Sequence, residues 1–340
     1  MLYIRTDMNG IVATGHVMRC LAIADAAKSL GEDVTFILAD DQAAELLEKY
    51  GHRRLIMNTQ WNDMDSELPV MKQLIEKYKI GSILIDSYQV TEKYLKSLSA
   101  MVQTFYIDDL NAFLYPVDNI ICYANYWEKF KYSERYQKTR LFLGTKYAPL
   151  RKEFYGCGEK KINSQVKNLL LLSGGTDRHH ILGQILNRLK VDQYSQINVV
   201  CGRFDAQYDL LKSQETFDTN VKVYRSVSDM EKFMKEADLV ISAGGTTLYE
   251  LCAVGTPAIS YSIADNQLDN VKKFHEDGII DYAGDVRKDD VAGNIGRYLQ
   301  MYHLDQRLRQ EKSKKMQKLV DGEGAWRIAK VLLGDNGRSR

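Results

Sequence analysis

The sequence predicts an α/β protein with two domains, each built around a parallel β-sheet. Short apolar runs alternate with longer amphipathic stretches along the chain, and this alternation is typical of βαβ units. The chain has 340 residues, which is enough for two domains of about 100–200 residues each. A polar stretch, GCGEKKINSQ, separates two such series at residues 156–165. We therefore expect one domain over 1–155, a linker over 156–165 and a second domain over 166–322.

The first domain begins with a short apolar strand that leads through a loop into a long helix. Gly31 ends this helix, and Gly51 caps the second one. Later runs are short and rich in β-branched residues, as buried parallel strands are. The expected strands cover residues 2–5, 34–39, 82–85, 104–107 and 119–123, and the expected helices cover 16–30, 42–50 and 69–78.

The second domain repeats this alternation and ends in a long helical region. A glycine-containing break at 321–324 interrupts the helical stretch 304–333. The expected strands cover residues 168–172, 197–201, 221–224, 239–242 and 258–261. Open α/β sheets bind ligands at the carboxyl ends of their strands, and domain interfaces favour small-molecule pockets. We therefore expect a ligand site in a cleft between the two domains.

Composition excludes several classes of function. The formal charge is +1, from 46 basic and 45 acidic residues. The chain therefore lacks the large positive charge that would indicate binding to nucleic acid or to an anionic membrane. The five cysteines form no CxxC pair, which argues against a disulfide framework and a structural zinc site. No signal peptide or apolar run of ~18 residues is visible. We expect a monomeric cytoplasmic protein without a membrane segment, a nucleic-acid partner or a cofactor.

The loop after the first strand carries the candidate reactive residue. Gly10 and Gly15 bracket this loop, and His16 follows at the expected start of the helix. The positive end of a helix disfavours protonation of the imidazole, and a general base must be neutral, whereas a bound diphosphate would favour protonation. An isolated histidine is more often a packed or capping residue, so this interpretation depends on the companion loops. Arg19 shares a helix face with His16 and could contact a phosphate or pair with Asp7; a surface ion pair is equally consistent.

Polar side chains also follow two later strands of the first domain. One strand leads into Asp86, Ser87 and Tyr88, and another leads into Asp108 and Asp109. A tyrosine at a strand end could orient a substrate or a water molecule. Paired carboxylates could indicate acid–base catalysis or a metal site. An isolated Asp-Asp sequence after a strand, however, more often belongs to a loop or caps a helix.

The strongest single signal lies in the second domain, where a strand runs into Gly244, Gly245, Thr246 and Thr247. Paired glycines let backbone N–H groups approach an anion, and the threonine hydroxyls and helix N-terminus add donors. No GKS or GKT sequence follows, so ATP hydrolysis is not implied. Glu250 lies one turn into the helix, where its carboxylate could accept both hydroxyls of a ribose.

Two further segments of the second domain are expected near this loop. Asn266 and Gln267 suit the hydroxyl and acetamido groups of a sugar, although an ordinary turn explains them better when they are taken alone. Gly174 and Gly175 follow the first strand of the domain and form another close-approach loop. His179–His180 comes next, but adjacent side chains point apart on a helix, so no metal site is expected.

Together, these segments resemble a known family. The stretches GHVMRCLAIADA, LIDSYQV, YIDDL, GTKYAPLRKEF, SGGTD, SAGGTTLYELCAVGTP with its trailing DNQ, and DGEGAWRI are similar to those of the UDP-sugar hydrolases of pseudaminic acid biosynthesis. These enzymes release UDP from UDP-2,4-diacetamido-2,4,6-trideoxy-β-L-altropyranose and belong to the GT-B superfamily. The resemblance runs from the N-terminus to about residue 330.

The resemblance implies a GT-B fold, in which two Rossmann-like domains place their parallel sheets across a cleft. It implies that His16 is the catalytic histidine and that Tyr88 and Asn266 lie near the sugar. It also implies that the loop from Gly244 and Glu250 bind the nucleotide, and that a last helix over 323–334 packs back toward the first domain.

These observations lead to one main function and two alternatives. The main prediction is a metal-independent hydrolase in which His16 activates water and UDP leaves, with UDP-sugar as the substrate. The first alternative is a GT-B glycosyltransferase that uses a UDP-sugar donor in polysaccharide biosynthesis. The second is a binding protein for nucleotide sugars without catalytic activity, against which the presence of His16, Tyr88 and Asn266 weighs.

Overall fold

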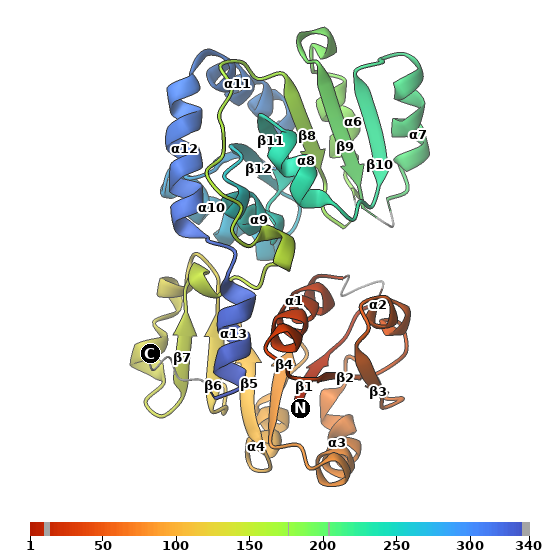
Figure 1. Ribbon diagram of the computed structural model, residues 1–340, viewed down its shortest axis with the longest axis vertical. Coiled ribbons are helices and arrows are strands. Elements are labelled where there is room, and N and C mark those ends of the chain that lie inside the picture. The colour runs from red at the N-terminus through yellow and green to blue at the C-terminus, as the bar shows by residue number, and fades with distance from the viewer. Residues whose placement is uncertain (10–13, 176, 203–204, 335–340) are drawn as a thin grey trace. The chain divides into compact units, whose positions relative to one another are not determined.

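The computed structural model describes residues 1–9, 14–175, 177–202 and 205–334. The chain forms two compact units. Unit 1 comprises Met1–Lys152 together with the C-terminal segment from Gly322, and unit 2 comprises Glu153–Asp321. Each unit is built on a parallel sheet with helices (Figure 1).

Unit 1 has a sheet of seven parallel strands in the order β3-β2-β1-β4-β5-β6-β7. The strands are β1 (Leu2–Thr6), β2 (Val34–Leu38), β3 (Arg53–Ile56), β4 (Ser82–Asp86), β5 (Gln103–Ile107), β6 (Asn119–Cys122) and β7 (Arg140–Leu143). The helices are α1 (Gly15–Ser29), α2 (Ala44–Lys49), α3 (Met64–Tyr78), α4 (Glu92–Ser99), α5 (Tyr132–Arg135) and α13 (Gly324–Leu332). The strand order reverses between β1 and β4, and ligands of doubly wound sheets bind at such a switch point.

Unit 2 has a sheet of six parallel strands in the order β10-β9-β8-β11-β12-β13. The strands are β8 (Asn168–Leu172), β9 (Gln196–Cys201), β10 (Val221–Arg225), β11 (Leu239–Ala243), β12 (Ala258–Ser262) and β13 (Asp281–Asp285). The helices are α6 (Ile181–Leu186), α7 (Tyr208–Ser213), α8 (Met230–Glu236), α9 (Thr247–Val254), α10 (Leu268–Glu276), α11 (Val291–Leu304) and α12 (Gln306–Leu319). Its switch point lies between β8 and β11.

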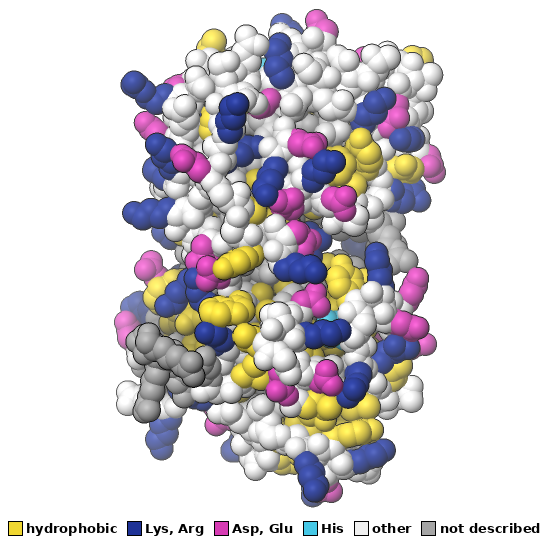
Figure 2. Space-filling model, in the orientation of Figure 1, with side chains coloured by type: hydrophobic (Ala, Val, Ile, Leu, Met, Phe, Trp, Pro, Cys, Tyr) yellow, Lys and Arg dark blue, Asp and Glu magenta, His cyan; other side chains and the backbone are white. Residues whose placement is uncertain are grey.

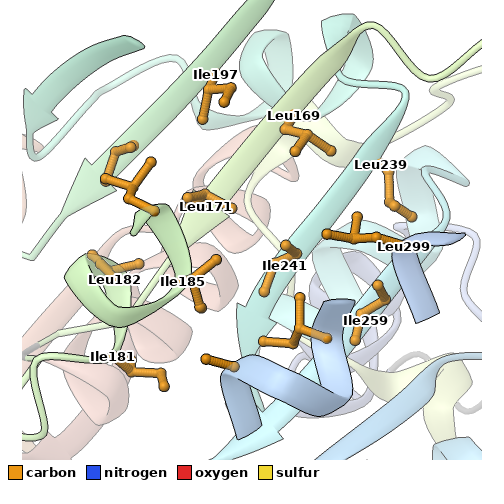
Figure 3. Close-up of a cluster of buried hydrophobic side chains, with 14 of the residues drawn as sticks. Leu169, Leu171, Ile181, Leu182, Ile185, Ile197, Leu239, Ile241, Ile259 and Leu299 are labelled. Carbon is orange, nitrogen blue, oxygen red and sulfur yellow. The ribbon is translucent and has the colours of Figure 1, made fainter. Parts of the chain in front are cut away.

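Apolar side chains from strands and helices form the core of each unit. In unit 2, Leu169, Leu171 and Ile241 project from β8 and β11 toward Ile181, Leu182 and Ile185 of α6 and Leu299 of α11 (Figure 3). A second buried cluster fills unit 1 between its sheet and α3 and α4. These strands are buried on both faces, which explains why they are continuous apolar runs in the sequence.

The C-terminal helix α13 belongs to unit 1, where it packs against α1 (Figure 1). Its first residue, Gly324, lies against the backbone of the segment after β7. A Cβ atom on Gly324 would lie 2.1 Å from the carbonyl oxygen of Ala148. Because only a glycine fits this approach, the Gly break in the sequence marks both the start of α13 and its docking point.

Several elements differ from the expectations. Three strands that the apolar pattern did not predict are β3, β7 and β13. The outer strand β3 is partly exposed and begins with Arg53 and Arg54, so it lacks an apolar run. The sequence of β13 is DYAGD, and its buried Asp281 is satisfied by the Tyr302 hydroxyl at 2.7 Å and the Lys312 ammonium at 3.1 Å.

The start of α3 also differs from the expectation. The helix begins at Met64, five residues before the expected start at Pro69, which therefore lies inside it. The Asp63 side chain accepts a hydrogen bond from the Ser66 N–H at 3.3 Å and caps the helix. Helix α4 was not predicted, and the Thr91 hydroxyl caps it by accepting from the Tyr94 N–H at 3.0 Å.

The polar stretch 156–165 is held against unit 2, and the division between the units falls at Lys152 and Glu153. The Lys160 ammonium donates to the Ala237 carbonyl oxygen at 2.8 Å, and the Asn163 amide donates to Asp238 at 2.7 Å. The polar side chains that suggested a linker therefore make tertiary contacts.

Candidate functional site

The switch point of unit 1 brings together His16 and Asp86, which are 70 residues apart in the sequence. His16 is the second residue of α1, directly after the loop that follows β1, and Asp86 is the last residue of β4. Because β1 pairs with β4, the carboxyl ends of the two strands lie side by side. The preceding Gly10 lies outside the described residues, so its predicted role in the loop is not addressed by the structure.

His16 and Asp86 form a close, buried pair. The Nδ1 atom of His16 lies 2.6 Å from Oδ1 of Asp86, and both side chains are at most 8% exposed. Burial disfavours the charged form of Asp86, but Arg19 and His16 outweigh it and hold the pKa of this carboxyl well below its usual range. Since Asp86 is ionised, a contact of this length requires the imidazole proton on Nδ1. The lone pair of the neutral ring is then on Nε2, as a general base requires.

Arg19 completes this arrangement from the next turn of α1. Its Nε donates to Oδ2 of Asp86 at 2.6 Å, and its Nη2 donates to Oδ1 of the same carboxylate. Its Nη1 donates to the Tyr123 hydroxyl at 2.7 Å and lies 3.4 Å from Oδ2 of Asp109. The suggested pairing of Arg19 with Asp7 is therefore wrong. Four of its five N–H donors are thus directed at protein groups, and Arg19 is 7% exposed, which makes it a poor candidate for a phosphate contact.

Asp7, which the sequence suggested as a substrate contact, is bound by structural partners. Its Oδ2 accepts from Arg5 at 2.5 Å, and its Oδ1 accepts from the Ala39 N–H at 2.8 Å. Arg5 is fully buried and also pairs with Glu67 through Nε at 2.8 Å and Nη2 at 2.7 Å. Both Asp7 oxygens thus help to hold the start of the loop after β1, and a contact of Asp7 with substrate stays a prediction.

Tyr88 lies directly against the imidazole. The rings of Tyr88 and His16 meet edge to face, with centroids 4.6 Å apart and an interplanar angle of 81°. The Tyr88 hydroxyl donates to Oδ2 of Asp109 at 2.9 Å, and burial together with the charge of Asp109 raises the pKa of Tyr88. The other oxygen of Asp109, Oδ1, is buried and has no hydrogen-bond partner among the described residues. Tyr88 is thus held beside His16, and Asp109 retains one unused acceptor.

The glycine loop of unit 2 lies at its switch point, after β11 and before α9. The amides of the two glycines are not the available donors that the sequence suggested: the Gly244 N–H bonds to Tyr261 at 2.8 Å and the Gly245 N–H to Ala243 at 2.9 Å. In the described part of the chain, the amides of Thr246 and Thr247 have no acceptor. The available N–H groups therefore belong to the helix N-terminus, the usual place for a bound phosphate.

The two glycines have different structural roles. A Cβ on Gly244 would lie 2.1 Å from Cγ1 of Val271, whereas a Cβ on Gly245 would meet nothing within 4 Å. Gly244 allows close packing inside the unit, and Gly245 leaves open space above the loop. Asn270 supports the loop by donating to the Gly244 carbonyl oxygen at 3.1 Å and accepting from the Tyr249 hydroxyl at 2.8 Å.

The remaining predicted site residues of unit 2 differ in exposure and in hydrogen bonding. Glu250 is half-buried on α9, and Asn266 is exposed directly before α10. The Gln267 side chain accepts from the Ile263 N–H at 2.9 Å, so its oxygen braces the turn after β12. Gly174 has a φ of +81°. The carbonyl oxygen of Gly175 lies so near Gly202 that a Cβ there would be 2.0 Å away.

Sequence reasoning did not select the residues that hold the site side chains and the glycine loop in place by hydrogen bonds. Asp86, Asp109, Tyr123 and Asn270 were not chosen as site residues, although two of them stand at strand ends in the runs DSY and DD. Their position at a strand end was the available signal, because only the strand order shows which ends are neighbours. No group of three or more His, Cys, Asp or Glu side chains suited to a metal ion occurs among the described residues. In the same residues, no helix is both long and apolar enough to span a membrane.

Comparisons with known proteins agree with this architecture. Residues 169–321 match the family model described as the glycosyltransferase family 28 C-terminal domain. The crystal structure of MurG from Acinetobacter baumannii superposes with a TM-score of 0.70 at 15% identity, covering 98% of this chain and 100% of that chain. These similarities and the two parallel sheets confirm the predicted GT-B fold of two Rossmann-like domains.

Three relatives by sequence differ in how much they share with the chain. The uncharacterized protein MJ1062 of Methanocaldococcus jannaschii is 26% identical over 75% of the chain, which spans only 54% of that relative. The spore coat polysaccharide biosynthesis protein SpsG of Bacillus subtilis is 23% identical over 94% of the chain and 93% of its own length. The third relative is from Campylobacter jejuni subsp. doylei and is named UDP-N-acetylglucosamine–N-acetylmuramyl-(pentapeptide) pyrophosphoryl-undecaprenol N-acetylglucosamine transferase. It is 30% identical over 35% of the chain and 36% of its own length.

Proposed function

We propose that this protein hydrolyses a UDP-sugar, with His16 as the general base that activates water. The observation that carries the proposal is the His16–Asp86 pair, whose 2.6 Å contact leaves Nε2 as the basic nitrogen of the neutral ring. The packed His52 also contacts a carboxylate, but that carboxylate, Asp25, is 32% exposed, whereas Asp86 is fully buried and forms the shorter contact. Histidine oriented in this way is a recurrent general base.

The UDP part of the proposal is supported by unit 2. This unit matches a glycosyltransferase family model, and one relative is named for a UDP-sugar donor. The amides of Thr246 and Thr247 and the positive end of α9 would hold the diphosphate, while Gly245 leaves space for its approach. Glu250 would accept the ribose hydroxyls. The domain over 166–322 is accordingly proposed to bind UDP, and the domain over 1–155 to supply the base.

In the proposed reaction, a water oxygen attacks the anomeric carbon of the sugar. Nε2 of His16 accepts the proton of that water, and the bond between the anomeric carbon and the phosphate oxygen breaks. UDP leaves with this oxygen, and the developing charge is stabilised by the N-terminus of α9. Direct attack by water from the face opposite UDP inverts the anomeric configuration. The proposed steps use His16 and the donors at the start of α9, and the proposed enzyme is metal-independent.

The sugar is proposed to be the 2,4-diacetamido-2,4,6-trideoxy-β-L-altropyranosyl group that the family resemblance implies. Acetamido groups carry N–H donors, and Oδ1 of Asp109 is an acceptor without a partner among the described residues. Tyr88 and the exposed Asn266 are proposed to orient the sugar or the water. The similarity to SpsG supports a role in surface-glycan biosynthesis, and we propose a monomeric cytoplasmic enzyme.

The second candidate is a glycosyltransferase that uses the same UDP-sugar site and an acceptor hydroxyl in place of water. The comparisons favour this candidate, since the matching family model and the transferase of Campylobacter jejuni subsp. doylei both belong to sugar transfer. The burial of His16 favours water instead, because the imidazole side chain is only 8% exposed and packs against the Tyr88 ring. A small nucleophile reaches such a base more easily than a sugar or lipid hydroxyl.

Product analysis in ¹⁸O-water tests this proposal. The purified protein is incubated without acceptor with the UDP-diacetamido-altropyranose and with UDP-N-acetylglucosamine as a comparison. We expect UDP release and one ¹⁸O atom on the sugar. Label on UDP instead would mean attack at phosphorus and would rule out the mechanism. Release of UDP only after addition of a lipid-linked sugar acceptor would favour the transferase, and UDP binding without turnover under any condition would favour a binding protein.

A further inference from the structure

Arg19 shares the carboxylate of Asp86 with His16. Asp86 Oδ1 receives both the Nδ1–H of His16 and the Nη2 of Arg19, while its Oδ2 receives Nε of Arg19 at 2.6 Å. Nη2 of Arg19 also lies 2.9 Å from Nδ1 of His16. Because Nδ1 carries a proton directed at Asp86, this last approach places a guanidinium beside a ring N–H and forms no hydrogen bond.

The position of this guanidinium has an electrostatic consequence. A carboxylate alone beside an imidazole favours the doubly protonated, charged ring, which is not a base. A fixed positive charge at the same distance opposes that protonation. Arg19 is 7% exposed, so solvent screens this effect only weakly.

We propose that Arg19 is a positioning residue that lets Asp86 orient His16 without leaving the imidazole charged. Asp86 fixes the proton on Nδ1, and Arg19 offsets most of the negative charge that would draw a second proton to Nε2. This inference rests on the proposed role of His16 as a base. It differs from the roles that the sequence left open for Arg19, which were a phosphate contact, a pairing with Asp7 and a surface ion pair.

The other groups near His16 do not supply the same balance. The Tyr88 and His16 rings meet edge to face, Tyr123 contacts Arg19, and Asp109 contacts both Arg19 and Tyr88. Burial raises the pKa of Tyr123 to about 12, and burial also raises the pKa of Cys20, whose thiol lies 3.4 Å from Asp86. The two tyrosines and the cysteine are therefore neutral near pH 7, which leaves Arg19 as the cation in contact with Asp86.

Charged groups on the elements packed against α1 are engaged elsewhere. On β1, Arg5 pairs with Asp7 and Glu67. On α13, Arg327 donates to the Lys146 carbonyl oxygen and pairs with Glu323. Lys330 of the same helix lies over the Trp326 ring, 3.9 Å from its centroid.

The test is an NMR titration of the ¹⁵N-labelled imidazoles in the full-length protein, which needs no turnover. The chain has six histidines, and His16→Gln identifies the His16 signals. In the wild type we expect the neutral ring to be the Nδ1–H tautomer. In Arg19→Met the titration midpoint of His16 should rise by roughly 1–3 pH units, and in Arg19→Lys it should rise less, because a lysine keeps the charge but not the fork geometry.

His52 is the matched control, because its Nε2 lies 2.9 Å from Asp25 without an arginine in the pair. Its midpoint should not change in either variant. A His16 midpoint that is unchanged or lower in Arg19→Met overturns the proposal. If that variant does not fold, the wild-type spectrum still decides, since an Nε2–H tautomer would also overturn it. Failure of UDP-sugar hydrolysis would leave these measurements intact and would refute only the proposed function.

Discussion

Replacing Asp86 by asparagine removes the group that fixes the His16 tautomer while keeping the size of the side chain. An asparagine has one acceptor where Asp86 has two, and those two now serve His16 Nδ1 at 2.6 Å and Arg19 Nε at 2.6 Å. Both oxygens of Asp86 face Arg19, and Oδ1 also faces His16, so either orientation of the amide places its NH₂ group against an N–H donor. With the NH₂ group at the position of Oδ1, Nδ1 can accept only if the ring proton moves to Nε2, and the base is lost. In the other orientation, the neutral amide oxygen lacks the negative charge that holds the proton on Nδ1.

The size of the effect follows from this loss of general-base catalysis. Such catalysis contributes about 10²–10⁴-fold, which corresponds to about 3–5 kcal/mol of transition-state stabilisation. Asp86→Asn should therefore lower kcat for UDP release by about 10²–10⁴-fold with little change in UDP affinity. The buried Arg19 also loses its main counter-charge, so thermal stability should fall, and activity must be measured well below the melting temperature.

The assay is continuous detection of UDP release, with circular dichroism to verify folding. Asp25→Asn is the matched control, because Asp25 contacts His52 in the same unit and should leave kcat unchanged. In a His16→Asn background, Asp86→Asn should cost little more, because both changes remove one function. A single Asp86→Asn variant with a kcat near the wild-type value, or costs that multiply in the double variant, would refute the reasoning.

Three further substitutions test the packing role of Gly244, the ligand-binding role of Gly245 and the buried charge of Lys160. Gly244→Ala places a Cβ 2.1 Å from a buried side chain and should lower the free energy of unfolding by about 1–3 kcal/mol. In Gly245→Ala the new Cβ meets no atom within 4 Å. This variant should keep its stability but bind UDP more weakly in calorimetry. The reverse pattern would contradict the assigned roles. Burial lowers the pKa of Lys160 to about 8 in the folded protein. Above that pH the unfolded chain therefore binds more protons than the folded chain. The free energy of unfolding should rise by on the order of 1 kcal/mol between about pH 8 and 10. Lys160→Met should lack this gain in denaturant titrations, and an identical pH profile in both proteins would contradict the burial of a charged Lys160.

The fold could be predicted from the sequence where burial leaves a simple pattern. Strands such as β8 and β11 are apolar on both faces, so each is a continuous run bounded by polar residues. Strands β3 and β13 escaped this logic. The first is partly exposed with two arginines, and the second buries acids that distant residues satisfy. Their identity depends on tertiary partners that a local pattern does not contain.

The site was predictable only in part, for a similar reason. His16 and Tyr88 could be chosen from their places at element ends, and the structure brings their rings into contact. The role of Arg19 could not be foreseen, because its acceptor Asp86 is 67 residues away and becomes its neighbour only through the strand order. Sequence reasoning likewise counted the amides of the paired glycines among the anion donors, whereas hydrogen bonds inside the unit use both of these amides and leave those of the helix N-terminus.

The face of the molecule shown in Figure 2 carries a mixed surface charge. Lysines and arginines are interspersed with acidic residues over the face shown in Figure 2, without a large area of one sign. The formal charge of +1 agrees with this distribution. Affinity for an anionic substrate would therefore come from local donors such as those at the start of α9, and it should depend only weakly on salt.

The central claim is that His16 acts on the reacting water, and His16→Asn tests it most directly. Asparagine keeps a polar side chain but has no basic nitrogen. We expect kcat for hydrolysis of the UDP-sugar to fall by about 10²–10⁴-fold, while UDP binds with wild-type affinity in calorimetry. Turnover that survives in the folded variant at the wild-type rate would contradict the assignment of His16 as the base.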